Sequence, residues 1–101
     1  KSYQAESIAH KQQEFDVIND SIQKKQKLNF LYQRVNQKDD KSIGFEVEPY
    51  KLVNNLGIWY LVAIHDDKIK VFSITRISLP KILNQSFTIG CPVYTVIVHQ
   101  Y

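Results

Sequence analysis

The sequence predicts a mainly β domain with an N-terminal helix, in which about five short strands form a small, strongly bent sheet that closes into a barrel. Two observations predict this fold class. Apolar residues recur at helical spacing in the first part of the chain, and beyond it they alternate with polar residues at strand spacing. The 101 residues, of which 44% are hydrophobic, suffice for one core, so we expect a single domain.

The first segment, residues 1–26, is expected to be helical and to pack on a barrel formed by residues 27–101. Phe15, Ile18 and Ile22 lie three and four residues apart, a spacing that marks one narrow stripe on a helix. A single stripe provides a single contact face. The helix should therefore lie across the sheet rather than inside a bundle.

The segments that follow have the alternation of strands joined by short turns. Asn, Asp and Gly tolerate the positive φ that tight hairpins need, so these residues mark the turns. Strands are expected at residues 28–33, around 45–48, at 58–64 and at 69–77, with hairpin turns at 54–57 and 65–68. The second to fourth strands therefore form a meander.

The segment GIWYLVAI, residues 57–64, lacks the alternation of a surface strand, because seven consecutive residues after the glycine are apolar or aromatic. Trp59 and Leu61 point to one face of such a strand, and Tyr60 and Val62 point to the other. We expect the barrel core to cover one face, and the helix or a ligand to cover the other.

The last part of the chain is expected to hold a short helical turn and a final strand. Pro80 lies near the start of residues 78–84, as is common in the first turn of a helix, and residues 94–98 are rich in β-branched side chains. On the fourth strand, Lys70 and Arg76 should share one face, roughly 20 Å apart at about 3.3 Å per residue.

Composition narrows the class of protein. Thirteen Lys and Arg against ten Asp and Glu give a formal charge of +3 and a pI near 9.0, a mild bias toward anionic partners that is weaker than in a dedicated DNA-binding domain. The one cysteine, Cys91, cannot form an internal disulfide. Apolar runs are far shorter than the roughly 20 residues that cross a bilayer, so we expect a cytoplasmic protein without a membrane partner.

The first residue is Lys, and the sequence contains no Met, so we expect the chain to be a piece of a longer protein.

Enzyme activity is not expected. The histidines at 10, 65 and 99 are scattered over different elements, and Asp66 and Asp67 suit a hairpin turn better than an acid and base pair. The three glycines form no phosphate-binding loop. We therefore expect no catalytic residue, no metal and no cofactor.

Four motifs resemble one known family. They are the tripeptide Trp59-Tyr60-Leu61, which follows the turn glycine Gly57, and the segments LNFLY at 28–32, EPYKL at 48–52 and KVFSITRI at 70–77. Their order and spacing are similar to those of the WYL domain, which is found mainly in bacterial transcription regulators, usually behind an N-terminal winged helix. The resemblance runs from about Ile18 to Ile77.

The resemblance implies an SH3-like or Sm-like barrel that senses a nucleotide or single-stranded nucleic acid and signals to an attached DNA-binding domain. Carried over position by position, it implies a ligand site at five residues: Tyr32, Trp59, Tyr60, Lys70 and Arg76. The sequence departs from the commoner pattern at Lys70, which replaces Arg, and at Ser73 and Thr75, where Arg or an acidic residue is frequent. The pocket is therefore less basic than usual.

Alternatives stay open for the same residues. Arg76 could pair with Glu46 or Glu48 and only stabilise the barrel, and Trp59 and Tyr60 could belong to the core. The domain could also serve chiefly as a dimerisation module of the regulator, through the helix stripe or an open strand edge, and bind no ligand of its own.

Overall fold

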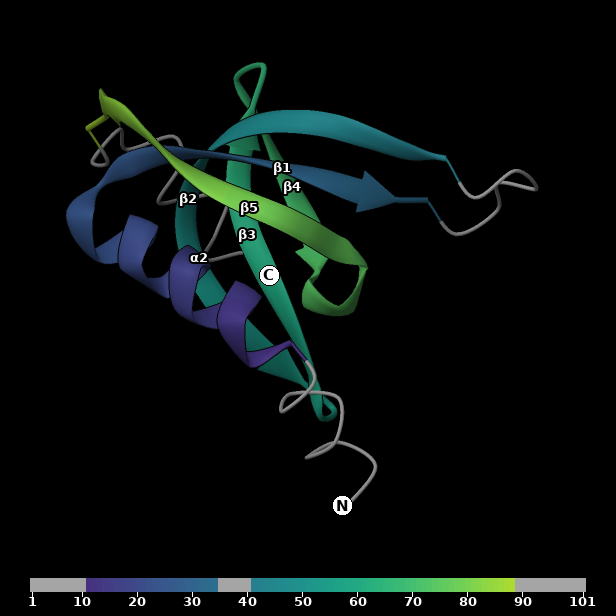
Figure 1. Ribbon diagram of the computed structural model, residues 1–101. Helices are drawn as coiled ribbons and strands as arrows, with labels where there is room; N and C mark the ends of the chain where they lie inside the picture. Colours follow the sequence, from purple (N-terminus) through teal and green to yellow (C-terminus); the bar gives the residue numbers. More distant parts are fainter. Residues whose placement is uncertain (1–10, 35–40, 89–101) are drawn as a thin grey trace.

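The structure is a computed structural model that describes residues 11–34 and 41–88. This part of the chain is mainly β with one N-terminal helix, which confirms the predicted composition of the fold (Figure 1). The elements are α2 (Gln12–Lys24), β1 (Gln26–Gln33), β2 (Ser42–Asn55), β3 (Ile58–His65), β4 (Lys68–Ser73), the short 3₁₀ helix η1 (Ile74–Arg76) and β5 (Ile77–Ser86). The five strands form one antiparallel sheet in the order β4-β3-β2-β1-β5.

The sheet is open, so the predicted closure into a barrel is wrong. β4 and β5 are the two edges of the sheet, although only the three residues of η1 join them along the chain. Helix α2 instead packs against β5, β2 and β1 and covers the inner face (Figure 1). Periodicity along the sequence shows where strands are, but it does not show whether two edges meet. The SH3-like or Sm-like assignment stays a prediction.

The fourth predicted strand, 69–77, ends earlier than expected. β4 stops at Ser73, and η1 turns the chain before β5 begins. Ile74 and Ile77 are 1% and 0% exposed. Residues three apart lie on opposite faces of a strand but on the same side of a 3₁₀ turn, so the turn lets both isoleucines enter the core. Lys70 and Arg76 therefore do not share one strand face.

The helical turn predicted at residues 78–84 is also wrong, because this segment belongs to β5. The register pairs Asn29 with Lys81 but Leu31 with Ser78, so β5 contains an extra residue and bulges. Pro80 lies in this bulge on an edge strand, where its missing N–H breaks no ladder. The strand predicted at residues 94–98 lies outside the described residues.

One core forms between α2 and the inner face of the sheet. Its buried members are Ile18, Leu28, Phe30, Val47, Leu61, Ala63, Phe72, Ile74 and Ile77. Phe30 and Phe72 meet edge to face with ring centroids 5.0 Å apart. The predicted apolar stripe of the helix supplies Ile18, and Lys11 Nζ donates to the carbonyl of Ile77 at 2.8 Å. The core thus joins the first and last described elements.

Two-residue turns close both hairpins of the meander, as the sequence predicted. Leu56 and Gly57 have φ of 53° and 87°, and Asp66 and Asp67 have φ of 53° and 62°. Two successive positive φ angles are the mark of type I′ turns, which match the twist of the strands. The Asn54 side-chain oxygen accepts the Gly57 N–H at 3.1 Å. These turns fix the register of β2, β3 and β4.

Leu56 gives a test of this turn geometry. Its side chain is 96% exposed and its backbone is left-handed, a conformation that asparagine adopts more readily than leucine. We expect Leu56→Asn to raise the free energy of unfolding by about 1 kcal/mol in urea titration. A loss of stability would contradict the assigned turn.

Candidate ligand-binding hollow

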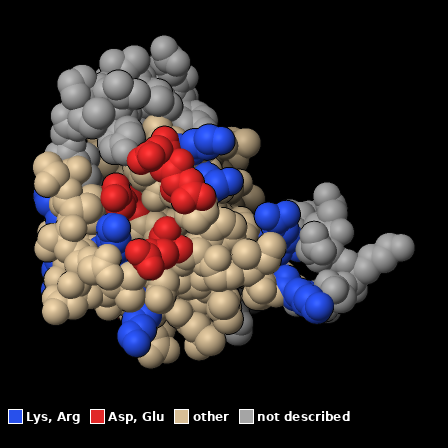
Figure 2. Space-filling model, turned by 90° about the horizontal axis from the view of Figure 1, so that it is seen from above, with Lys and Arg blue, Asp and Glu red and all other residues tan. Residues whose placement is uncertain are grey.

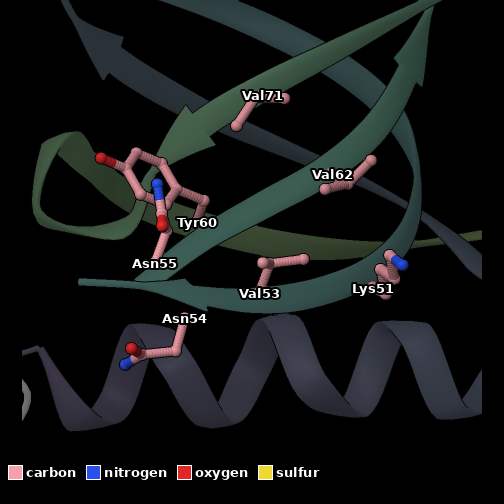
Figure 3. Close-up of a pocket in the computed structure, with 7 residues that line it drawn as sticks. All are labelled: Lys51, Val53, Asn54, Asn55, Tyr60, Val62 and Val71. Atoms are coloured by element: carbon pink, nitrogen blue, oxygen red, sulfur yellow. The ribbon is translucent and has the colours of Figure 1, made fainter. Parts of the chain in front are cut away.

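The outer face of β2, β3 and β4 carries an open hollow of about 440 Å³ (Figure 3). Seven residues line it: Lys51, Val53, Asn54, Asn55, Tyr60, Val62 and Val71. The hollow lies on the side of the sheet opposite the core. Its residues come from three neighbouring strands, so the sheet itself holds them in place.

Strand alternation places these side chains. Within β3, Leu61 and Ala63 point into the core, and therefore Tyr60 and Val62 point outward. The register sets Val53 of β2 opposite Tyr60, and Val62 is flanked by Lys51 of β2 and Val71 of β4. The apolar run that begins at Ile58 therefore serves both faces, one as core and one as the wall of the hollow.

The lining combines three kinds of chemistry. Val53, Val62 and Val71 provide an apolar floor, and the ring of Tyr60 stands beside them (Figure 3). Lys51 supplies the cation of the hollow, and its ammonium nitrogen lies 5.8 Å from the centre of the Tyr50 ring. Such a site suits a flat or apolar body that carries one anionic group.

Tyr60 is the one predicted site residue that lines this hollow. Its aromatic ring occupies the end near Asn55, and its oxygen points toward the η1 turn (Figure 3). Ser73, the last residue of β4, is its partner across the ladder. Tyr60 thus lies between the hollow and the corner where the chain leaves β4.

Trp59 lies on the other face of β3. Its ring meets Phe15 of α2 edge to face, with centroids 5.3 Å apart. The contact adds to the hydrophobic attachment of the helix, since such ring pairs contribute about 0.5–1.5 kcal/mol beyond their buried area. The two aromatic residues of the tripeptide therefore have different neighbours, one the helix and one the hollow.

Tyr32 belongs to the aromatic end of the core. Its ring packs edge to face on Phe72 at 5.0 Å, and its hydroxyl accepts the Ser73 N–H at 3.0 Å. The side chain therefore fastens the end of β4 to β1. It contacts the corner next to Tyr60 from the inside of the sheet.

The two predicted cations lie apart from the hollow lining. Lys70 is exposed on the edge strand β4, and Arg76 is half-buried in η1. Among the described residues no carboxylate lies within ion-pairing distance of Arg76. Glu46, one of its proposed partners, lies instead 3.9 Å from the ammonium of Lys27. The structural alternative for Arg76, an ion pair with Glu46 or Glu48, is not what the structure shows.

Sequence reasoning missed most of the hollow. Lys51, Val53 and Val71 are not among the five residues that the family resemblance implies for the site. The turn at 56–57 contained the missing signal, because a two-residue hairpin sets Val53 opposite Tyr60. A register written out from that turn places Lys51 and Val53 on the face of Tyr60 and Val62, and the turn at 66–67 adds Val71.

Charged side chains are mixed on the surface seen in Figure 2. Acidic groups gather near the middle of that view, and basic groups lie in separate places around them. This face therefore has no continuous basic track of the kind that follows a long phosphate backbone. The described residues contain no helix long and apolar enough to span a membrane.

Tyr32 allows its structural role to be measured. Tyr32→Phe leaves the ring but removes the acceptor of the half-buried Ser73 N–H, so we expect the free energy of unfolding to fall by about 1–2 kcal/mol. Tyr60→Phe is the matched control, because the Tyr60 hydroxyl has no hydrogen bond to a described residue. Equal effects of the two substitutions in urea titration would contradict the assignment.

Comparison with known proteins gives the family. Residues 13–82, more than half of the chain, match the WYL domain family. Proteasome accessory factor B/C (PafBC) of Arthrobacter aurescens has a similar fold, with a TM-score of 0.70 at 19% identity over 76% of this chain and 12% of that chain. No curated protein matches the sequence significantly. The chain belongs to the WYL domain family, as the motifs around Trp59 indicated.

Proposed function

We propose that this chain is the ligand-sensing regulatory domain of a bacterial transcription regulator, and that it binds a nucleotide-like ligand in the hollow of β2, β3 and β4. One observation carries the proposal: a tyrosine ring, an apolar floor and a lysine lie together in the hollow of a WYL domain. The domain acts in the cytoplasm by binding rather than by catalysis. It signals to a DNA-binding domain elsewhere in the protein.

Each part of the hollow matches a part of a nucleotide. A base stacks on the ring of Tyr60, an interaction that contributes about 1–3 kcal/mol per base. The ammonium of Lys51 attracts the phosphate, and the amide of Asn55 offers a donor and an acceptor to the edge of the base. The three valines exclude water from the other face of the ligand.

The charge distribution favours a single nucleotide unit over a long strand. Lys51 is the one charged residue among the residues that line the hollow. A protein that contacts several phosphates loses affinity steeply with salt, because log K falls by about 0.7 per phosphate contact for each tenfold rise in salt concentration on single strands. We therefore expect a shallow salt dependence, with a slope near that of one contact.

The proposal predicts which substitutions weaken binding. Tyr60→Ala removes the stacking surface and Lys51→Gln removes the cation, and each should weaken binding of labelled adenosine monophosphate about tenfold or more in fluorescence anisotropy at low salt. Lys24→Gln on α2 is the charge-matched control and should change little. Absence of binding to this probe and to a labelled short oligo-dT, or an equal loss in the control, would contradict the proposal.

The same assay tests the site that the family resemblance implies. Lys70→Gln and Arg76→Gln change cations outside the hollow lining, so we expect each to weaken binding by less than Lys51→Gln does. A larger loss at Arg76 would move the phosphate site to the corner formed by Ser73, Thr75 and η1, where the two hydroxyls lie 3.0 Å apart.

A further inference from the structure

A second surface, on the outer face of β1, β2 and β5, has features that the ligand hollow does not explain. Leu79 projects from the bulge of β5 with 73% of its surface exposed. Its backbone is left-handed, with φ of 52°, a conformation that is costly for leucine. A strained backbone that presents a leucine to solvent is an outlier for which a function should be sought.

A shallow depression lies directly beside Leu79. Seven residues line it, namely Asn29, Phe30, Leu31, Gly44, Phe45, Glu46 and Leu79, and its volume is about 510 Å³. Gly44 faces Leu31 across the β1–β2 ladder, and the absence of a side chain there leaves the depression open. A Cβ added at Gly44 would meet only Leu31 Cδ2, at 3.9 Å, which is ordinary contact. The fold itself therefore does not require glycine for space.

We propose that the protruding side chain of Leu79, here called the knob, and the depression beside it form a symmetric interface between two copies of the chain. A two-fold interface needs a patch that complements itself, because the same surface is used on both sides. Here a protruding leucine and an apolar depression lie side by side, so two copies can each insert Leu79 beside Leu31 and Gly44 of the other. The inference is independent of the proposed ligand.

The charges around the patch also suit a second copy. Glu46 lines the depression, and Lys81 follows the bulge in β5 on the same outer face as its ladder partner Asn29. The ammonium of Lys27 lies 3.9 Å from the Glu46 carboxylate, so the patch carries both signs of charge, and two copies related by a two-fold axis can set unlike charges opposite each other. A strongly basic or acidic partner would lack this balance.

Sedimentation velocity of the chain over a concentration series tests the interface. We expect a reversible monomer–dimer equilibrium in the wild type. Leu79→Asn keeps a residue that tolerates the left-handed backbone but removes both knobs of the dimer, so the dissociation constant should rise about 100-fold, or about tenfold for each leucine. A wild-type chain that stays monomeric at every concentration would overturn the proposal.

Leu56→Asn is the matched control. Leu56 has almost the same φ, 53°, and is even more exposed, but it lies at the β2–β3 turn. The control should dimerise like the wild type. An equal loss in both variants would show general apolar adhesion instead of a specific interface and would also overturn the proposal.

A second test adds a side chain in the depression instead of removing the Leu79 side chain. Gly44→Val adds apolar surface at a strand position where an added Cβ makes only ordinary contact, and it fills the place that Leu79 of the other copy would occupy. We expect dimerisation to weaken while the melting temperature does not fall. Stronger association of this variant would contradict a knob that enters this depression.

Cross-linking locates the contact directly. In a Cys91→Ser background, chains with Leu79→Cys and differently tagged chains with Gly44→Cys are mixed and oxidised. We expect a disulfide-linked heterodimer in high yield, and a much lower yield when Leu56→Cys replaces Leu79→Cys. Equal yields with both partners would refute the proposed pairing.

Discussion

The structure depends on the burial of β3, a central strand that is apolar on both faces. Its inner face buries Leu61 and Ala63 completely, and full burial of a side chain such as leucine contributes about 1.5–3 kcal/mol. Its backbone pairs with β2 on one side and β4 on the other. The outer face stays apolar as well, so the sheet presents Tyr60 and Val62 on a strand that is paired on both sides. The hollow is therefore positioned by the same strand that organises the core.

Helix α2 shields the core of this open sheet from solvent, as closure of the sheet does in a barrel. An open sheet leaves its concave face uncovered, and one amphipathic helix is enough to cover it because the core is small. Ile18 inserts into the core, while the Phe15–Trp59 contact and the Lys11 hydrogen bond fasten the start of the helix to β3 and β5. The face opposite Trp59 is then left uncovered by the helix and carries the hollow. Two neighbouring residues of the tripeptide thus have different roles: Trp59 attaches the helix, and Tyr60 supplies the aromatic ring of the hollow.

Local sequence signals predicted the helix, β1, β3 and the positions of both hairpin turns, because spacing and turn residues determine these elements within a few positions. The same signals failed at η1 and β5, where packing between distant residues decides the structure. Burial of both Ile74 and Ile77 in the core requires the 3₁₀ turn, and a bulge on the edge strand accommodates Pro80. The hollow was predicted only through Tyr60. Lys51 joins it by strand pairing, a relation between distant residues that composition and motif do not reveal.

Strand β2 connects the two proposed surfaces. Gly44 near its start belongs to the depression beside Leu79, whereas Lys51 and Val53 near its end line the hollow. The register shift between Pro49 and Lys51 separates these two parts of the strand. A change in twist at this irregularity would alter both surfaces, since each is built on the backbone of the same strand. Linkage then requires reciprocity: if dimerisation changes the affinity for the ligand by some factor, the ligand changes the affinity between copies by a corresponding factor.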